Sequence, residues 1–234
     1  MKNGSIISID NLVKRFPIGG GEFTALNGIN LSFSKGEFTG IVGPSGSGKT
    51  TMLNILGSLD SPTLGVTEVL GTSSNHMTPK LAASLRKQHI GFIFQTYNLM
   101  PVYTVYENVE FPLLLLKQPA SERKKAVLKA LEWVGLTDKL KSKPPMLSGG
   151  ESQRVAIARA MVKKPDLVLA DEPTANLDAE NSHHILQTME KLNKELETTF
   201  VFATHDEKVI GYLRRIIRLE DGQVVSDEQI KQKQ

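Results

Sequence analysis

The sequence predicts an α/β fold built around a mainly parallel β-sheet, and three observations support this prediction. Residues 149–225 alternate helix and strand patterns, as chains that build parallel sheets do. Near the N-terminus, a glycine-rich loop stands between a short apolar strand pattern and a helix pattern. With 40% hydrophobic and 23% charged residues among 234, the composition is typical of a soluble globular chain. Disordered and collagen-like chains are therefore excluded.

Composition also excludes several classes of function. The chain has no cysteine, so disulfide frameworks, zinc clusters and thiol nucleophiles are ruled out. The net charge of +3 is too small to indicate a nucleic-acid partner. No apolar run approaches the roughly 20 residues that a membrane-spanning helix needs. The first ten residues also lack the apolar stretch of a signal peptide. We therefore expect any membrane contact to be made through another protein.

We treat residues 1–234 as a single domain with four parts. Residues 1–95 are rich in β patterns, residues 96–148 are mainly helical, residues 149–225 complete the core, and residues 226–234 form a polar tail that we expect to be flexible. A turn is expected at Gly19–Gly21 and a hairpin turn at Asp221–Gly222. We expect strands at 5–9, 29–33, 38–42, 90–94, 167–170, 200–203, 216–220 and 223–225, and helices at 51–59, 121–134, 152–162 and 180–196.

The helical zone allows two interpretations of its surface. From Lys117 to Lys143 it carries eight basic and three acidic residues, which fits either a solvated helix face or a docking face for an acidic or membrane-proximal partner. The apolar run Leu113–Leu116 fits either the core of this zone or an exposed contact surface. The sequence alone leaves both alternatives open.

The glycine-rich loop matches the pattern G-x-x-x-x-G-K-[ST] in full, with a strand before it and a helix after it. Its glycines let successive backbone N–H groups point inward as an anion nest, and the following helix directs its positive end to the same place. Lys49 supplies a charge for the β- and γ-phosphates of a nucleotide, and the hydroxyl of Thr50 suits Mg²⁺. The predicted phosphate-binding residues are Gly43, Pro44, Ser45, Gly46, Ser47, Gly48, Lys49 and Thr50.

Two acids follow the apolar strand pattern at residues 167–170. Ligands of such sheets bind beyond the carboxyl ends of the strands, so Asp171 is placed to hold Mg²⁺, through water. Glu172 is one residue further on, where it can orient or deprotonate an attacking water. The guanine-specific pattern N-K-x-D is absent, which argues against a GTPase.

The segment before this strand narrows the possible classes of nucleotide-binding protein. It reads LSGGE at residues 147–151 and continues as SQRVAIARAMVKKPDLVLADEP. Here the chain strongly resembles the ATP-binding cassette (ABC) ATPases, and the resemblance extends from about Ser5 to Val225. It implies a P-loop NTPase of ABC type. The expected fold has a RecA-like, mainly parallel core, an antiparallel β subdomain and a helical subdomain. ATP and Mg²⁺ are the cofactors that the resemblance implies.

The resemblance also implies roles for single residues. Phe16 stands where the family places an aromatic side chain that stacks on adenine, although a core position is the alternative. Gln95 matches the Q-loop, Asp178 the D-loop and His205 the switch histidine. The implied catalytic residues are Glu172, His205, Gln95 and Lys49; Thr50, Gln95 and Asp171 would hold the metal; and Thr51, Ser148, Gly149, Gly150 and Asp178 would join the phosphate loop in binding ATP.

A second anion site is expected where Ser148, Gly149 and Gly150 open a helix. In the family this signature faces the nucleotide held by the other protomer. A two-fold pair then buries two ATP molecules, each between the phosphate loop of one copy and the signature of the other. Hydrolysis removes the bridging γ-phosphate and opens the dimer. A second copy of the chain is therefore an expected partner.

Further segments are similar to the LolD/MacB/FtsE group of the family, a mechanotransmission type. These are residues 52–60, 91–101, 107–112 and 169–178. Because the chain ends soon after the last expected strand, its layout is similar to that of the stand-alone lipoprotein-releasing ATPase. Glu151 replaces a commoner glutamine.

The group implies a permease partner with a large extracytoplasmic domain, docked near residues 97–116, and a place on the cytoplasmic face of the cell membrane. Lipoprotein release or drug and peptide export is the expected activity. The alternative is a regulatory ATPase controlling a cell-division or cell-wall hydrolase complex. A soluble DNA-repair ATPase would need a long coiled coil, and a translation ATPase usually carries two cassettes; neither feature is present.

Overall fold

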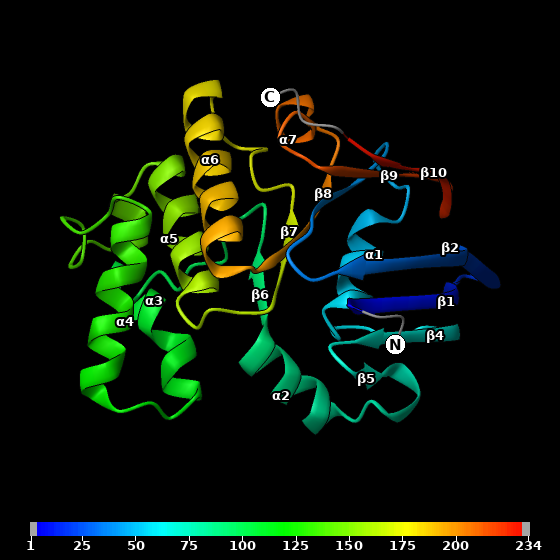
Figure 1. The fold of residues 1–234 in the computed structure, drawn as a ribbon, viewed down its shortest axis with the longest axis horizontal. Helices are drawn as coiled ribbons and strands as arrows, with labels where there is room; N and C mark the ends of the chain where they lie inside the picture. The colour runs from blue at the N-terminus through cyan, green and yellow to red at the C-terminus, as the bar shows by residue number, and fades with distance from the viewer. Residues whose placement is uncertain (1–3, 231–234) are drawn as a thin grey trace.

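The computed structural model describes residues 4–230, which form two β-sheets and a group of helices (Figure 1). The elements are β1 (Ser5–Ile18), β2 (Gly21–Ser34), β3 (Phe38–Val42), α1 (Lys49–Leu56), β4 (Leu64–Val69), β5 (Thr72–Ser73), α2 (Pro79–His89), β6 (Ile90–Ile93), α3 (Val105–Leu115), α4 (Ala120–Trp133), α5 (Gly149–Met161), β7 (Leu167–Asp171), α6 (Ala179–Leu196), β8 (Thr199–Thr204), α7 (Glu207–Ile210), β9 (Arg215–Glu220) and β10 (Gln223–Gln229).

The central sheet has the strand order β10-β9-β3-β8-β7-β6. All neighbouring pairs are parallel except β9 and β10, which form the hairpin predicted at Asp221–Gly222. The register pairs Val42 with Thr204 and Asp171 with Ala203. The carboxyl ends of β3, β8 and β7 therefore meet at one edge of the sheet, and the sequence motifs that follow these strands are brought together there.

The second sheet is antiparallel, with the order β2-β1-β4-β5. Its two longest strands, β1 and β2, extend well beyond the segments that the sequence pattern indicates. Several register shifts interrupt their pairing, including one between Leu12 and Lys14. A β-bulge breaks the period-2 alternation of side chains, so the pattern hid the true length of both strands. The predicted turn at Gly19–Gly21 lies where β1 passes into β2.

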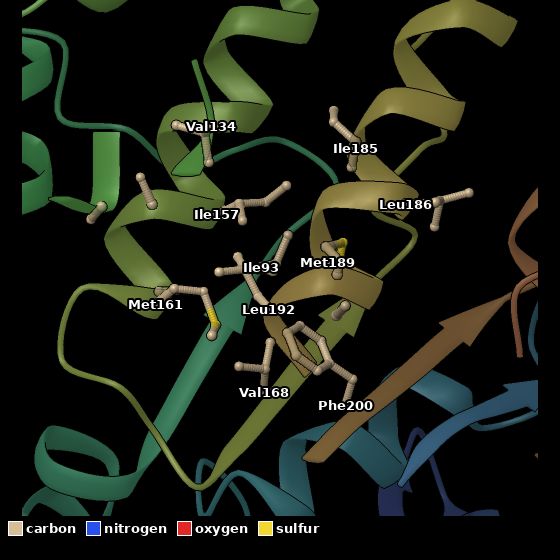
Figure 2. Packing of buried hydrophobic residues seen from close by; sticks show 14 of the residues in the cluster. Ile93, Val134, Ile157, Met161, Val168, Ile185, Leu186, Met189, Leu192 and Phe200 are labelled. Atoms are coloured by element: carbon tan, nitrogen blue, oxygen red, sulfur yellow. The ribbon is translucent and has the colours of Figure 1, made fainter. Parts of the chain in front are cut away.

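Helices α3 to α6 lie together on one side of the central sheet, whereas the antiparallel sheet lies on the other side (Figure 1). Alternate side chains of β7 and β8 serve the two sides: Val168 and Phe200 pack toward the helices, and Leu169 and Val201 pack toward α1 and the antiparallel sheet. Figure 2 shows α5 and α6 contributing Ile157, Met189 and other apolar side chains above the strands. Burial of such side chains stabilises the fold by about 1.5–3 kcal/mol each.

Two sequence expectations need correction. Helix α2 was not predicted, although Thr78 caps it and Pro79 occupies its first turn, both ordinary signals of a helix start. The expectation of a flexible tail at 226–234 is wrong for its first four residues, because β10 continues to Gln229. Arg215 holds this extension through two hydrogen bonds of 2.7 Å to Asp227. Residues 231–234 lie outside the described residues.

The leucine run at 113–116 is divided between a buried and an exposed environment. Leu113 is buried in the helical core, whereas Leu114 and Leu115 are about half exposed. Within residues 4–230, no helix has the length and apolar character needed to span a membrane.

Candidate active site

The phosphate loop joins β3 to α1 in a conformation that demands glycine. Gly48, directly before α1, has φ +103°, and Gly46 has φ +82°. A Cβ atom at Gly43 would lie 2.0 Å from the carbonyl oxygen of Leu219. The buried Lys49 side chain crosses back over the loop, and its Nζ donates hydrogen bonds of 2.8 Å to the carbonyls of Gly43 and Pro44. The loop therefore wraps around the Lys49 side chain, and an anion that enters the loop can draw the ammonium group toward itself.

A cavity of about 500 Å³ opens beside this loop. Most of the predicted nucleotide residues line it, although they come from five separate parts of the chain. Its lining residues are Phe16, Phe23, Ala25, Ser45, Gly46, Gly48, Lys49, Thr50, Thr51, Gln95, Asp171, Glu172 and His205. Of the other loop residues, Gly43 and Pro44 accept the Lys49 hydrogen bonds, and Ser47 is buried with a hydroxyl that has no hydrogen-bond partner. A lysine whose ammonium is held over the loop by two carbonyls fits a site built for a polar ligand.

Asp171, at the end of β7, faces the first turn of α1. The hydroxyl of Thr50 lies 3.0 Å from one carboxylate oxygen of Asp171 and 3.2 Å from the other. Burial raises the pKa of the Asp171 carboxyl above its ordinary value, and the charge of Glu172 adds to this, while the Thr50 hydrogen bond and Lys49 oppose it. The two side chains place oxygen atoms side by side, the ligand type that Mg²⁺ prefers.

Glu172 is held in a strained conformation next to Asp171. Its φ of +45° lies in the left-handed region, which costs energy for a residue with a side chain. The carboxylate accepts a 3.0 Å hydrogen bond from Thr204, and its other oxygen lies 2.6 Å from Nδ1 of His205. The His205 side chain is 67% exposed, whereas that of Glu172 is 13% exposed. A buried acid beside an exposed imidazole can accept a proton from water and keep that water oriented.

Two further predicted residues lie at the cavity mouth. Gln95 is exposed just beyond β6, and its carbonyl accepts a 2.9 Å hydrogen bond from the side chain of Asn176. Phe16 is 36% exposed, and Nζ of Lys14 lies 4.9 Å from the centre of its ring. The ring is therefore a lining residue rather than a core residue.

The sequence analysis missed Phe23 and Ala25, which also line the cavity. Phe23 pairs directly with Phe16 across the β1–β2 hairpin. Cross-strand partners share one face of a sheet, so the two rings lie beside the same cavity. Counting outward from the turn at Gly19–Gly20 would have found this pair.

The residues of the LSGGE signature, Ser148, Gly149 and Gly150, lie outside this cavity. Ser148 caps α5: its hydroxyl accepts from the backbone N–H of Glu151 at 3.2 Å, and the Glu151 carboxylate accepts from the backbone N–H of Ser148 at 2.8 Å. Neither Ser148, Gly149, Gly150 nor the D-loop Asp178 lines the cavity. Asp178 caps α6 instead, accepting from the backbone N–H of Asn181 at 2.8 Å.

Packing within a single copy of the chain also explains why residue 150 is a glycine, Gly150. A Cβ atom there would lie 2.5 Å from Oδ1 of Asn181, so packing against α6 requires glycine. Ser148 and Gly149, by contrast, are exposed. The exposed N-terminus of α5 therefore lies apart from the nucleotide cavity of its own chain.

A closed lysine loop at a strand–helix junction, with an acid at the end of a neighbouring parallel strand, defines a P-loop nucleoside triphosphatase. The family profile described as ABC transporter matches residues 26–175, so the chain belongs to the ABC transporter ATPase family.

Curated relatives agree over nearly the full chain. The uncharacterised ABC transporter ATP-binding protein MJ0796 of Methanocaldococcus jannaschii is 42% identical over 97% of this chain and 98% of its own length. The lipoprotein-releasing system ATP-binding protein LolD of Pseudoalteromonas translucida is 43% identical, covering 97% of each chain. The macrolide export ATP-binding/permease protein MacB of Burkholderia pseudomallei is 40% identical over 96% of this chain, which spans only 34% of that longer protein.

Solved structures agree with the fold. A dimeric structure of the MJ0796 cassette matches with a TM-score of 0.90 at 41% identity, covering 97% of this chain and all of that one. A second structure of MJ0796, a post-hydrolysis dimer bound to ADP and Pi, matches with a TM-score of 0.89. The predicted resemblance and fold class are confirmed, and the chain is an ATP-binding, ATP-hydrolysing cassette of an ABC transporter.

Proposed function

We propose that this chain dimerises around two ATP molecules and drives a membrane permease from the cytoplasmic face of the cell membrane. One observation carries the proposal. The cavity gathers the phosphate loop and the acids of β7, whereas the capped, exposed end of α5 lies outside it. A site that is complete only when a second copy supplies Ser148 explains both facts.

In this proposal, the phosphates of ATP lie along the glycine loop, and Lys49 moves from its two carbonyl acceptors to the β- and γ-phosphates. The base stacks on Phe16, with Phe23 on the same face of the hairpin. Thr50 and Asp171, with Gln95, would hold Mg²⁺, since the first two already place oxygen atoms about 3 Å apart. When bound, Mg²⁺ supplies charge neutralisation at the phosphates.

Glu172 accepts the proton of the attacking water, and Thr204 and His205 hold its carboxylate in place. His205 lies on the exposed side of Glu172, where it can turn toward a γ-phosphate. Loss of that phosphate removes the group shared by both copies, so the dimer opens and moves whatever is docked on it.

An apolar groove of about 540 Å³ supports a permease as the docked partner. It lies between the central sheet and the helices. Its apolar lining includes Phe92, Phe94, Met100, Phe111 and Leu115, and the basic side chains of Arg86, Lys87, Arg159 and Lys163 also line it. The rings of Phe92 and Phe94 stack in parallel with centres 5.7 Å apart. The groove includes part of residues 97–116, where the sequence resemblance predicts permease docking, and an amphipathic helix would bury its apolar side there.

The relatives support the finer assignment. Several relatives that match over nearly their whole length carry the name of a lipoprotein-releasing system, and some longer ones carry that of a macrolide exporter. We propose a permease with a large extracytoplasmic domain and lipoprotein release, or drug and peptide export, as the driven process.

Light scattering after size-exclusion chromatography tests the dimer. Glu172→Gln should bind ATP and elute as a dimer with ATP and as a monomer without it, while its turnover falls by about 100- to 10,000-fold. Adding Ser148→Arg to that variant should leave a monomer that still binds ATP, because the bulky cation blocks the partner's phosphate. A dimer peak for the double variant would reject the shared site, and wild-type turnover by Glu172→Gln would reject Glu172 as the base.

A further inference from the structure

The loop that follows Gln95 is held in an unfavourable conformation. Tyr97 and Asn98 are consecutive non-glycine residues with φ +62° and +48°. The left-handed region costs a residue with a side chain roughly 1–2 kcal/mol, so two such residues in a row need outside support. A loop under this strain takes its position from the groups that hold it.

Arg159 of α5 provides that support. Its guanidinium donates one hydrogen bond of 2.7 Å to the carbonyl of Tyr97 and one of 2.5 Å to the carbonyl of Asn98. Burial lowers the pKa of Arg159, in keeping with a cation that is largely withdrawn from water. The guanidinium reaches the two carbonyls through two different nitrogens held in one plane, a geometry that a single lysine ammonium does not reproduce.

The same loop also contacts the other end of α5. The hydroxyl of Tyr97 lies 3.0 Å from the position that a Cβ atom would take at Gly149. The carbonyl of Asn176 lies 3.6 Å from that position, and the side chain of Asn176 donates to the carbonyl of Gln95. The signature end of α5 thus lies against the loop that carries Gln95.

We infer that Arg159 and Tyr97 are positioning residues that fix the signature end of α5 relative to Gln95. This inference rests on the proposed function, in which Gln95 reaches one ATP and Ser148 reaches the other. A shift of Gln95 on nucleotide binding then moves the strained loop, and Arg159 and Tyr97 carry the movement into α5. The two ATP sites of the dimer communicate through this path.

The first test separates positioning from simple packing. In Arg159→Met and Arg159→Lys, we expect ATP affinity of the monomer to stay within about twofold, kcat to fall about tenfold, and the Hill coefficient for ATP to fall toward one. Arg123→Met is the matched control, since Arg123 also bonds a backbone carbonyl, that of Gln118, at 2.6 Å. The control should lose thermal stability alone. Arg159 variants that behave like this control would overturn the assignment.

The second test uses Tyr97 and does not depend on the Arg159 variants folding. In the Glu172→Gln background, Gly149→Ala should weaken the ATP-dependent dimer by pressing against the tyrosine hydroxyl. Tyr97→Phe removes only that oxygen, so the double variant should regain affinity by at least about threefold over Gly149→Ala. Additive effects, or equal dimer affinities for every variant, would overturn the inference. Failure of Glu172→Gln alone to dimerise would instead count against the proposed function.

Discussion

Two helix N-termini on this chain follow glycine- and serine-rich segments, yet they are built differently. α1 begins after Gly48 with no side-chain cap, whereas α5 begins with a complete capping box between Ser148 and Glu151. The first-turn donors of α1 are therefore left for a ligand, while those of α5 are partly satisfied within the chain. This difference fits the proposed dimer, in which the first end binds phosphate alone and the second receives a phosphate that the other copy already holds.

The two ends also differ in charge. Lys49 lies at the N-terminus of α1, and Glu151 lies in the first turn of α5. The Ser148 backbone N–H and the Lys139 ammonium lower the pKa of Glu151, so its carboxyl is ionised at neutral pH. In the proposed dimer, attraction at one end and repulsion at the other predict that ATP binds to the phosphate loop first and that the dimer closes afterwards.

Among the variants that test the difference between the N-termini of α1 and α5, Lys49→Ala should have the largest effect. Lys49→Ala deletes the charge that would leave its two carbonyl acceptors for the phosphates, and we expect ATP affinity by calorimetry to fall about 10- to 160-fold, given about 1.5–3 kcal/mol for one charged hydrogen bond. Lys163→Ala is the control, because Lys163 bonds the carbonyls of Arg86, Lys87 and Ile90 outside the cavity. It should melt at lower temperature and bind ATP normally. An unchanged ATP affinity of Lys49→Ala would contradict the proposal that the N-terminus of α1 attracts ATP through this lysine.

Gly150 tests whether the second end is shaped by packing or by phosphate. Gly150→Ala should destabilise the fold by roughly 1–3 kcal/mol in urea, because the new Cβ atom meets Asn181. Adding Asn181→Ala opens that space and should restore most of the lost stability. If the double variant also regains ATP-dependent dimerisation, packing alone explains this glycine; if it stays monomeric, the partner's phosphate needs the glycine as well.

Removing the negative charge of Glu151 at the N-terminus of α5 should have a smaller effect. Glu151→Gln keeps a residue that can complete a capping box but removes the negative charge beside the incoming phosphate. A charge at a helix N-terminus is worth about 0.3–1 kcal/mol, so dimer affinity in the Glu172→Gln background should rise about two- to fivefold. The gain should shrink in high salt, and a weaker dimer at low salt would contradict the electrostatic account.

The smallest expected effect concerns Asp171 in the nucleotide-free protein. Because its pKa is raised by burial, the folded protein holds this proton more tightly than the unfolded chain does. Ionisation therefore costs stability as the pH rises from the unfolded value, about 3.9, through the raised folded value. Asp171→Asn should slightly raise Tm at pH 7, and the gain should shrink toward about pH 4. A lower Tm at pH 7 would contradict this explanation.

The sequence was most informative where chemistry demands particular residues at fixed spacing. The phosphate loop, Asp171 and Glu172 were predicted because each follows a short, buried strand of the parallel sheet, and the topology brings those strand ends together. The role of His205 was implied by the family resemblance. Phe23 was missed because register shifts between Ser5 and Arg15 break the alternation of side chains, so the strand pattern was not followed as far as the turn, although the pairing next to the turn is regular. The packing of Gly150 against Asn181 joins residues 31 positions apart, and no local pattern records such a contact.

The most direct test is a structure of the Glu172→Gln variant with ATP and Mg²⁺. The account predicts that the hydroxyl of Ser148 of the partner subunit lies within hydrogen-bond distance, about 3 Å, of the γ-phosphate held by the phosphate loop. A structure in which every terminal phosphate contacts one copy only, with Ser148 distant from all of them, would contradict it.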